Sequence, residues 1–190
     1  MLADISRALN EKFYRERDSG LLAYLQSHAE EDKLRDQLAK ISQISDVVVL
    51  DNLIEAGVTA ESFMAFSLYP WVWVAWEDGK IDDSEREAVM KAAETEGIST
   101  ASTSYQLLQS WLSELPDLEL EDAWRSYASA LARELDEASL ESIRTVTFAR
   151  TRQVARAAGG ILGLGNKISK NEERTLLDLI HAFDKPVDLQ

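Results

Sequence analysis

Five carboxylates fall within nine residues near the middle of the sequence, in the segment WEDGKIDDSE (residues 76–85). Carboxylate oxygens are the ligands that Ca²⁺ and Mg²⁺ prefer in proteins. Asp78, Asp82, Asp83 and Glu85 lie within one turn and the start of a predicted helix, where the backbone can bring them together. Their mutual repulsion would be relieved by a cation. The segment is therefore a candidate site for a hard divalent cation.

The segment does not match the calcium loop of an EF-hand. That loop needs oxygen ligands at positions 1, 3 and 5, glycine at position 6 and glutamate at position 12. With Asp78 at position 5, Gly79 and Glu85 fall at positions 6 and 12. Positions 1 and 3 then fall on Val74 and Trp76, which have no side-chain oxygen. Any cation site here is of another kind.

The same residues also fit a purely structural role. Asp82 is a good N-cap residue and Glu85 stands three positions later, which is the spacing of a capping box worth about 1 kcal/mol. Acidic residues in a first helical turn suit the helix dipole, and Gly79 suits a turn with positive φ. Capping and cation binding therefore both stand as interpretations of this segment.

Other side chains that carry catalysis or hold metals are scarce. The sequence has no cysteine, and its two histidines, His28 and His181, are far apart. These counts exclude a disulfide framework, a cysteine zinc site, thiol catalysis and a multi-histidine site within one chain. Carboxylate pairs abound because the chain is acidic, so they carry no information about catalysis. We expect a protein that is not an enzyme.

The composition of the chain limits the classes of partner that it is expected to bind. The formal net charge of −14 argues against binding to nucleic acid or to anionic membranes, and it is compatible with a cation, a basic partner or simple solubility. The most apolar stretch, Phe63 to Trp76, is too short to span a membrane and contains Pro70. The N-terminus lacks the apolar core of a signal peptide. We expect a cytoplasmic protein with no transmembrane segment.

Helical periodicity dominates the chain and predicts an all-α fold, a compact bundle of about seven to nine helices. Ser45 or Asp46 can begin a helix that ends at Gly57, with Val47 and Leu50 on its apolar face. Pro70 should kink or split the apolar helix that contains it. Further helices are expected over residues 82–96, 103–113, 119–134, 137–158 and 169–182, with Trp111, Trp124 and Tyr127 as core aromatics.

The first 58 residues are predicted to form an N-terminal helical extension, which is followed by a domain over residues 59–184 and a tail over residues 185–190. Sparse apolar positions from Ile5 to Ile41 predict two or three amphipathic helices. They either pack on the domain or pair with another chain, since the apolar stripe is too irregular for a regular heptad. In the second case, a protein partner or a second copy of the chain would dock through these helices.

Two further features lie toward the C-terminus. Arg144, Arg150, Arg152 and Arg156 place positive charge on one predicted helix, as a solvated face or as a docking site for an acidic partner or for the chain's own acidic face. The run AAGGILGLGNK (residues 157–167) lacks the Lys-Ser/Thr of a phosphate-binding loop, and no strand precedes it. It predicts a close approach of two helices, a loose helix end or an exposed apolar patch.

Two parts of the chain share a local plan. An apolar helix is followed by DGKIDDSEREAVMKAAE in the first, and VARAAGGILGLG is followed by NKISKNEERTLLDLIHAF in the second. The alignment puts Lys80-Ile81 on Lys167-Ile168, Asp82 on Ser169 and Glu85 on Glu172. The shared pattern is K-I-[DS]-x-x-E before an amphipathic helix, so each copy carries a capping box.

Residues 60–184 resemble the TerB-like family, an all-helical domain associated with tellurite resistance, whose signature A-x-x-DG-x-[IV]-x-x-x-E stands here from Ala75 to Glu85. The resemblance implies divalent-cation binding by Asp78, Asp82 and Glu85, with Glu77 and Asp83 as neighbours. Gly165 and Ser169 replace the two aspartates in the second copy. The resemblance further implies a binding module in stress response or complex assembly; the alternative is a structural adaptor that docks through its N-terminal helices without metal.

Overall fold

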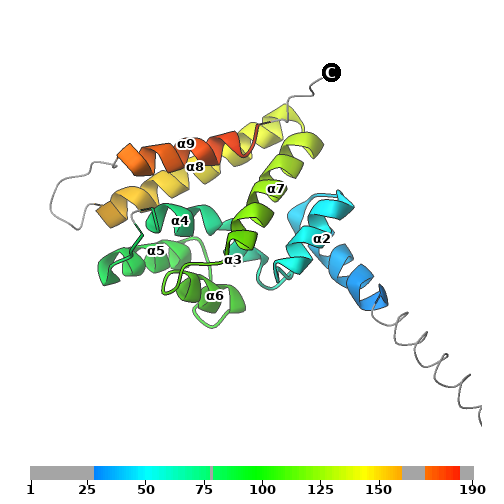
Figure 1. Cartoon of the computed structure of the whole chain (residues 1–190), viewed down its shortest axis with the longest axis horizontal. Helices are drawn as coiled ribbons and strands as arrows, with labels where there is room; N and C mark the ends of the chain where they lie inside the picture. The colour runs from blue at the N-terminus through cyan, green and yellow to red at the C-terminus, as the bar shows by residue number, and fades with distance from the viewer. Residues whose placement is uncertain (1–27, 78, 160–169, 185–190) are drawn as a thin grey trace, which may run out of the picture.

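The computed structural model describes residues 28–77, 79–159 and 170–184, and within them every regular element is an α-helix (Figure 1). The predicted all-α bundle is therefore confirmed. A helix over residues 28–42 comes first. The elements that follow it are α2 (Val47–Glu55), α3 (Phe63–Ser67), α4 (Tyr69–Ala75), α5 (Asp83–Thr95), α6 (Thr103–Trp111), α7 (Leu118–Glu134), α8 (Glu137–Gly159) and α9 (Lys170–His181).

The apolar segment around Pro70 forms two short helices, as its proline predicts. Helix α3 ends at Ser67 and α4 begins at Tyr69, with Leu68 between them. Pro70 stands in the first turn of α4, where a missing N–H costs no helical hydrogen bond. The Leu68 N–H donates to the Ala65 carbonyl at 3.0 Å, so the break keeps its backbone paired.

Helix α2 begins as expected and turns the predicted face to the core, except at its first residue. The Asp46 carboxylate accepts hydrogen bonds from the N–H groups of Val48 and Val49, which makes Asp46 its N-cap. Val49 and Leu50 are buried, whereas Val47 is 54% exposed. The prediction that Val47 lies on the apolar face is therefore wrong, because the first residue of the helix projects beyond its packing partners.

The two related parts of the sequence pack against each other. Helix α4 leads into α5, and α8 leads into α9, as the repeat predicts. Across the two pairs, α5 packs on α8, α4 packs on α9, and α4 also contacts α8 (Figure 1). Each copy thus places its second helix on the first helix of the other copy, which buries the apolar faces of both.

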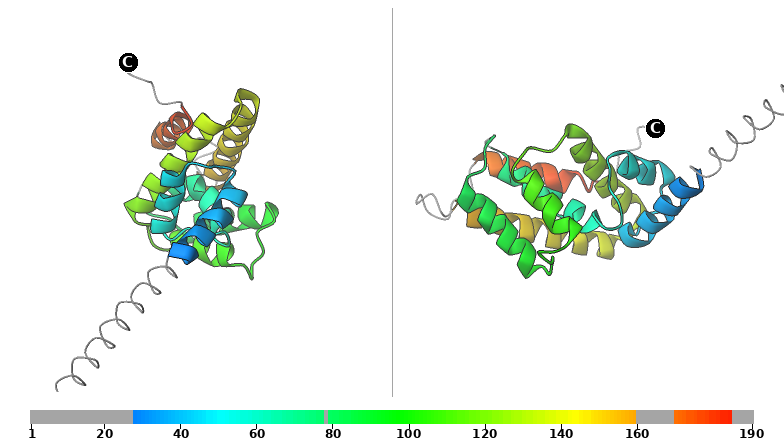
Figure 2. Two further views of the ribbon diagram at one scale, coloured as in Figure 1. Left: turned by 90° about the vertical axis from the view of Figure 1, so that its right-hand side faces the viewer. Right: turned by 90° about the horizontal axis from the view of Figure 1, so that it is seen from below.

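Residues 28–42 form a helix at one end of the molecule, beside α2 (Figure 2). Leu38 is 1% exposed and belongs to the same core as the later helices. Arg35 forms an ion pair with Asp51 at 2.7 Å, and the Tyr127 hydroxyl donates to the Ser42 carbonyl at 3.3 Å. Residues 28–42 of the extension therefore pack on the domain, which is one of the two predicted alternatives. Residues 1–27 and the tail, residues 185–190, lie outside the described residues.

The predicted core aromatics differ in depth. Trp124 is buried edge-on against Phe183, with ring centroids 5.7 Å apart. Tyr127 packs against Phe63 at 5.5 Å, and burial raises the pKa of its hydroxyl to about 12. Trp111 is only half-buried, so its prediction as a core residue holds in part. No helix within the described ranges is long and apolar enough to span a membrane.

A polar joint fixes the start of α2 to the end of α7. The Glu134 carboxylate accepts from the Ser45 hydroxyl and N–H and from the Asp46 N–H, and Arg133 pairs with Asp46 at 2.8 Å. Hydrogen bonds from Val49 and Arg133 lower the pKa of Asp46. Burial opposes ionisation of Glu134, but the hydrogen bonds from Ser45 and Asp46 outweigh it and lower its pKa. Both carboxylates therefore stabilise the folded state when they are charged.

Candidate functional site

The acidic loop, residues 77–85, leads from α4 into α5, and two of its carboxylates form the cap of that helix. The Asp82 carboxylate accepts a hydrogen bond from the Glu85 N–H at 2.8 Å, and the Glu85 carboxylate accepts one from the Asp82 N–H at 2.9 Å. This is the predicted capping box. Gly79 has φ of +80°, the left-handed conformation that glycine adopts without strain. The structural interpretation of Asp82, Glu85 and Gly79 is confirmed.

Two donors beside the acidic loop reach the end of α6. Arg86 pairs with the exposed carboxylate of Asp83 at 2.6 Å and donates from Nε to the Leu112 carbonyl at 3.2 Å. The Trp76 indole N–H donates to the Trp111 carbonyl at 2.7 Å. These carbonyls are at a helix end, where they lack partners within the helix. The hydrogen bonds fix the position of the segment that follows α6.

The cation prediction for this loop concerns Asp78, Asp82 and Glu85, and Asp78 lies outside the described residues. Among the residues that the structure does describe, no group of three or more carboxylates or histidines is arranged to hold a metal ion. Glu77 is half-buried at the end of α4, while Asp82 and Asp83 are exposed. The cation site therefore stays a prediction, and the capping box is the observed role of two of its members.

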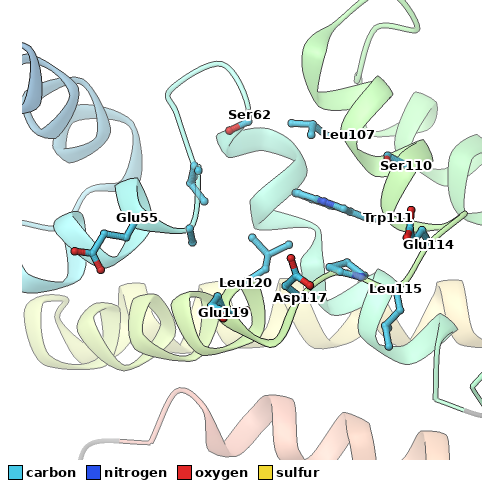
Figure 3. A pocket seen from close by; sticks show the side chains of 14 residues that line it. Glu55, Ser62, Leu107, Ser110, Trp111, Glu114, Leu115, Asp117, Glu119 and Leu120 are labelled. Carbon is cyan, nitrogen blue, oxygen red and sulfur yellow. The ribbon is translucent and has the colours of Figure 1, made fainter.

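A groove of about 770 Å³ lies between the end of α2, helix α6 and the start of α7 (Figure 3). The side chains of Leu107, Trp111 and Leu120 converge on its centre (Figure 3). Leu107 and Trp111 are four residues apart on α6, so they share one face of that helix. Val58 and Pro116 add further apolar surface. These apolar side chains come from three separate elements and form the floor of a groove whose remaining lining is largely polar.

Four carboxylates surround this floor: Glu55, Glu114, Asp117 and Glu119. Glu55 and Glu114 lie at opposite ends of the groove, and the Asp117 carboxylate turns toward its centre (Figure 3). All four residues are exposed. Within the described part of the chain none of them has a hydrogen-bond or ion-pair partner for its side chain, and Asp117 precedes α7 without a side-chain capping bond. We call these four residues the acidic rim.

An apolar ridge, formed by Leu115, Pro116 and Leu118, lies between this groove and a second, smaller hollow. Leu115 is 60% exposed and Leu118 is 74% exposed. Leu115 and Pro116 line both hollows, and the second one, of about 270 Å³, continues over Trp73 and Trp76 at the end of α4. Exposed leucines beside an apolar groove form the kind of surface that a protein partner covers.

Sequence reasoning did not predict this groove, because its members are spread over residues 55–120. One signal was present in ELPDLEL (residues 114–120), where acidic and apolar residues alternate on either side of a proline. The pattern was consistent with an ordinary loop and helix start. Only the packing of α2 and α6 beside it brings Glu55 and Trp111 to the same surface.

The arginines of α8 meet the chain's own acidic residues. Arg150 pairs with Glu96 at the end of α5 at 2.8 Å, and Arg144 pairs with Asp184 at 3.3 Å. The alternative in which this helix docks on the chain's own acidic face is thus observed for these two residues. Arg152 and Arg156 are exposed. Residues 160–169, which include most of the glycine-rich run and Ser169 of the second capping box, lie outside the described residues.

Comparison with known proteins adds no relative to this description. No protein-family model, curated protein sequence or solved structure matches the chain.

Proposed function

We propose that this chain is a non-catalytic, TerB-like helical binding module that acts as an adaptor, holding a segment of a protein partner in the groove between α2, α6 and α7. The observation that carries the proposal is the pairing of an apolar floor with an exposed ridge. Leu107, Trp111 and Leu120 supply the floor, and Leu115 and Leu118 stand beside it.

The exposed leucines favour a protein segment over a small molecule. A ligand of a few hundred Å³ inside the groove would leave Leu118, which is 74% exposed, in water. A segment that crosses the ridge would cover both leucines, and full burial of one such side chain is worth about 1.5–3 kcal/mol. The groove and the ridge together therefore suit a partner that lies across both.

The residues that lead into the ridge are anchored to neighbouring helices. Leu112, three residues before Leu115, is fully buried. The carbonyl of Trp111 accepts from Trp76, and that of Leu112 accepts from Arg86. A surface held by buried and hydrogen-bonded neighbours loses little conformational entropy on binding, which favours affinity. The ridge is thus already positioned for a partner.

Site-specific cross-linking in cells tests the proposal. A photoreactive p-benzoylphenylalanine replaces Leu115 in one variant and Leu177, which is 51% exposed on α9, in a control. We expect a discrete cross-linked partner from position 115 and none in common from position 177. The partner, once purified, should bind the wild-type chain and lose at least about tenfold in affinity toward Leu115→Ser with Leu118→Ser.

Two results would overturn the adaptor proposal. The first is the same set of cross-linked proteins from positions 115 and 177, since such cross-links would come from random collisions and not from a specific complex. The second is a purified partner that binds the serine variant as tightly as the wild type.

Divalent-cation binding at Asp78, Asp82 and Glu85 is a second proposal, and it is supported by the resemblance and by the exposure of Asp82 beside Asp83. A cation that binds only the folded chain raises its stability, by about 2.7 kcal/mol at a concentration one hundred times Kd. Thermal unfolding with Ca²⁺ or Mg²⁺ should therefore shift upward in the wild type and not in Asp78→Asn with Asp82→Asn. An equal shift in both would place any bound cation elsewhere.

A further inference from the structure

The groove carries a charge pattern that its apolar floor does not require. Glu55 and Glu114 stand at its two ends, and Asp117 and Glu119 lie along one side (Figure 3). Among the described residues that line it there is no lysine, arginine or histidine. Carboxylates gathered around a low-dielectric surface reinforce one another's potential and attract cationic groups.

The rim carboxylates are also available to a ligand, unlike the acidic residues of the chain that form internal ion pairs. Asp83 is paired with Arg86, Asp51 with Arg35 and Glu96 with Arg150. Within the described residues the four rim side chains have no such internal partner. A cationic ligand can therefore bind them without displacing an arginine of this chain.

We infer that the partner segment in this groove is a basic amphipathic helix of another protein, which rests on the proposed function of the groove. Its apolar face would lie on Leu107, Trp111 and Leu120, as in other helix-in-groove complexes. Lysine or arginine side chains at its two ends would reach Glu55 and Glu114. The apolar contacts give most of the affinity, and the charges give orientation, specificity and a faster association.

A second copy of this chain is a poorer occupant, because each copy carries a formal charge of −14 and like charges oppose association. The chain's own N-terminus is the other contender. Residues 5–17 contain Arg7, Lys12, Arg15 and Arg17 among apolar residues, and they end eleven positions before the described helix begins. The test must therefore separate a foreign helix from this segment.

The probes are two synthetic helices of about 18 residues with the same leucine face, one with lysine and one with glutamate on the polar face. Their binding to the full chain is measured by fluorescence anisotropy at about 0.05 M and about 0.3 M NaCl, over which charge screening increases strongly. We expect the lysine helix to bind at least about tenfold more tightly than the glutamate helix at low salt, and the difference to shrink at high salt.

Matched charge reversals locate the binding. Glu55→Lys with Glu114→Lys changes the two ends of the groove, and Asp36→Lys with Glu87→Lys makes the same change of charge on exposed helical positions elsewhere. The groove pair should weaken the lysine helix at least about tenfold, and the control pair less than about threefold. Equal weakening by both pairs, or equal affinity for the two probes, would overturn the inference.

Two more variants separate the possible failures. If Leu115→Ser with Leu118→Ser leaves the affinity for the lysine helix unchanged, the groove is not its site and the proposed function fails as well. If that variant abolishes binding while the charge reversals change nothing, only the basic partner is wrong. Ile5→Ser, Leu9→Ser and Phe13→Ser in one full-length chain should not alter the affinity. A gain of about tenfold would show that the chain's own N-terminus occupies the groove, which overturns the inference.

Discussion

The acidic loop and the acidic rim are both made of carboxylates, but the carboxylates of the two regions have different surroundings. In the loop, carboxylates that are adjacent in sequence bond to nearby groups: Asp82 and Glu85 cap α5, and Asp83 pairs with Arg86. In the rim, carboxylates from residues 55 to 119 gather around an apolar floor, without an internal partner in the described part of the chain. Internal bonding thus distinguishes the loop carboxylates, which support the fold, from the rim carboxylates, for which we propose a partner.

The two regions meet at the end of α6. Trp76 and Arg86, which flank the acidic loop, donate to the carbonyls of Trp111 and Leu112. The ridge begins at Leu115, three residues after Leu112. The loop therefore contributes to the groove by holding its wall in place, although none of its own carboxylates lines the groove.

The largest effect is expected at the point where the two regions join. Leu112 is fully buried, so Leu112→Ala should lower the free energy of unfolding by about 2–5 kcal/mol. Leu115 is 60% exposed, and Leu115→Ala should change it by less than about 0.5 kcal/mol. Urea unfolding at constant m value measures both. Similar losses for the two leucines would mean that the ridge is a part of the core.

The capping box gives the next largest difference. Asp82→Ala removes the acceptor of the Glu85 N–H and should cost about 1 kcal/mol of stability. Glu114→Ala removes a rim carboxylate with no partner among the described residues and should stay within about 0.5 kcal/mol of the wild type. Equal losses of the free energy of unfolding for the two variants, measured in urea, would contradict the distinction between loop and rim.

Acid unfolding tests a further set of carboxylates that serve the fold, at the joint between α2 and α7. The pKa values of Asp46 and Glu134 are lowered from their ordinary values of 3.8 and 4.5. A lowered pKa gives stability that is present above the unfolded pKa and is lost as the pH falls through the folded pKa. The wild type should therefore lose stability from about pH 5 downward.

The variant Asp46→Asn with Glu134→Gln lacks these two ionisations. It should be less stable than the wild type at neutral pH, and its stability should fall less steeply as the pH decreases. Chemical unfolding at a series of pH values provides the curve for each chain. Parallel curves would show that other groups dominate the acid response.

The smallest effect is expected for Asp83. Its side chain is fully exposed, and its ion pair with Arg86 spans three residues of one helix. Such surface pairs contribute little. Asp83→Asn should therefore lower the melting temperature less than Asp82→Ala does, which would divide the acidic loop into capping and non-capping members. A larger loss for Asp83→Asn would contradict this division.

The fold could be predicted from the sequence because its signals are local. Helical periodicity, the break at Pro70, the caps at Asp46 and Asp82 and the turn at Gly79 each depend on neighbours within a few residues. The exposure of Val47 was missed, because it depends on which elements pack against the start of α2. The groove was missed for the same reason, since Glu55, Trp111 and Leu120 meet only after three helices have packed.

The central claim is that the rim binds a partner and that the loop stabilises the fold. Its most direct test is the yield of the cross-link at position 115 in two double variants. The rim variant is Glu55→Lys with Glu114→Lys, and the loop variant is Asp82→Asn with Glu85→Gln. Each yield is measured well below the melting temperature of the variant. We predict that the rim variant loses the cross-link and keeps the wild-type melting temperature, whereas the loop variant keeps the cross-link and melts earlier. The reverse pattern would contradict the account.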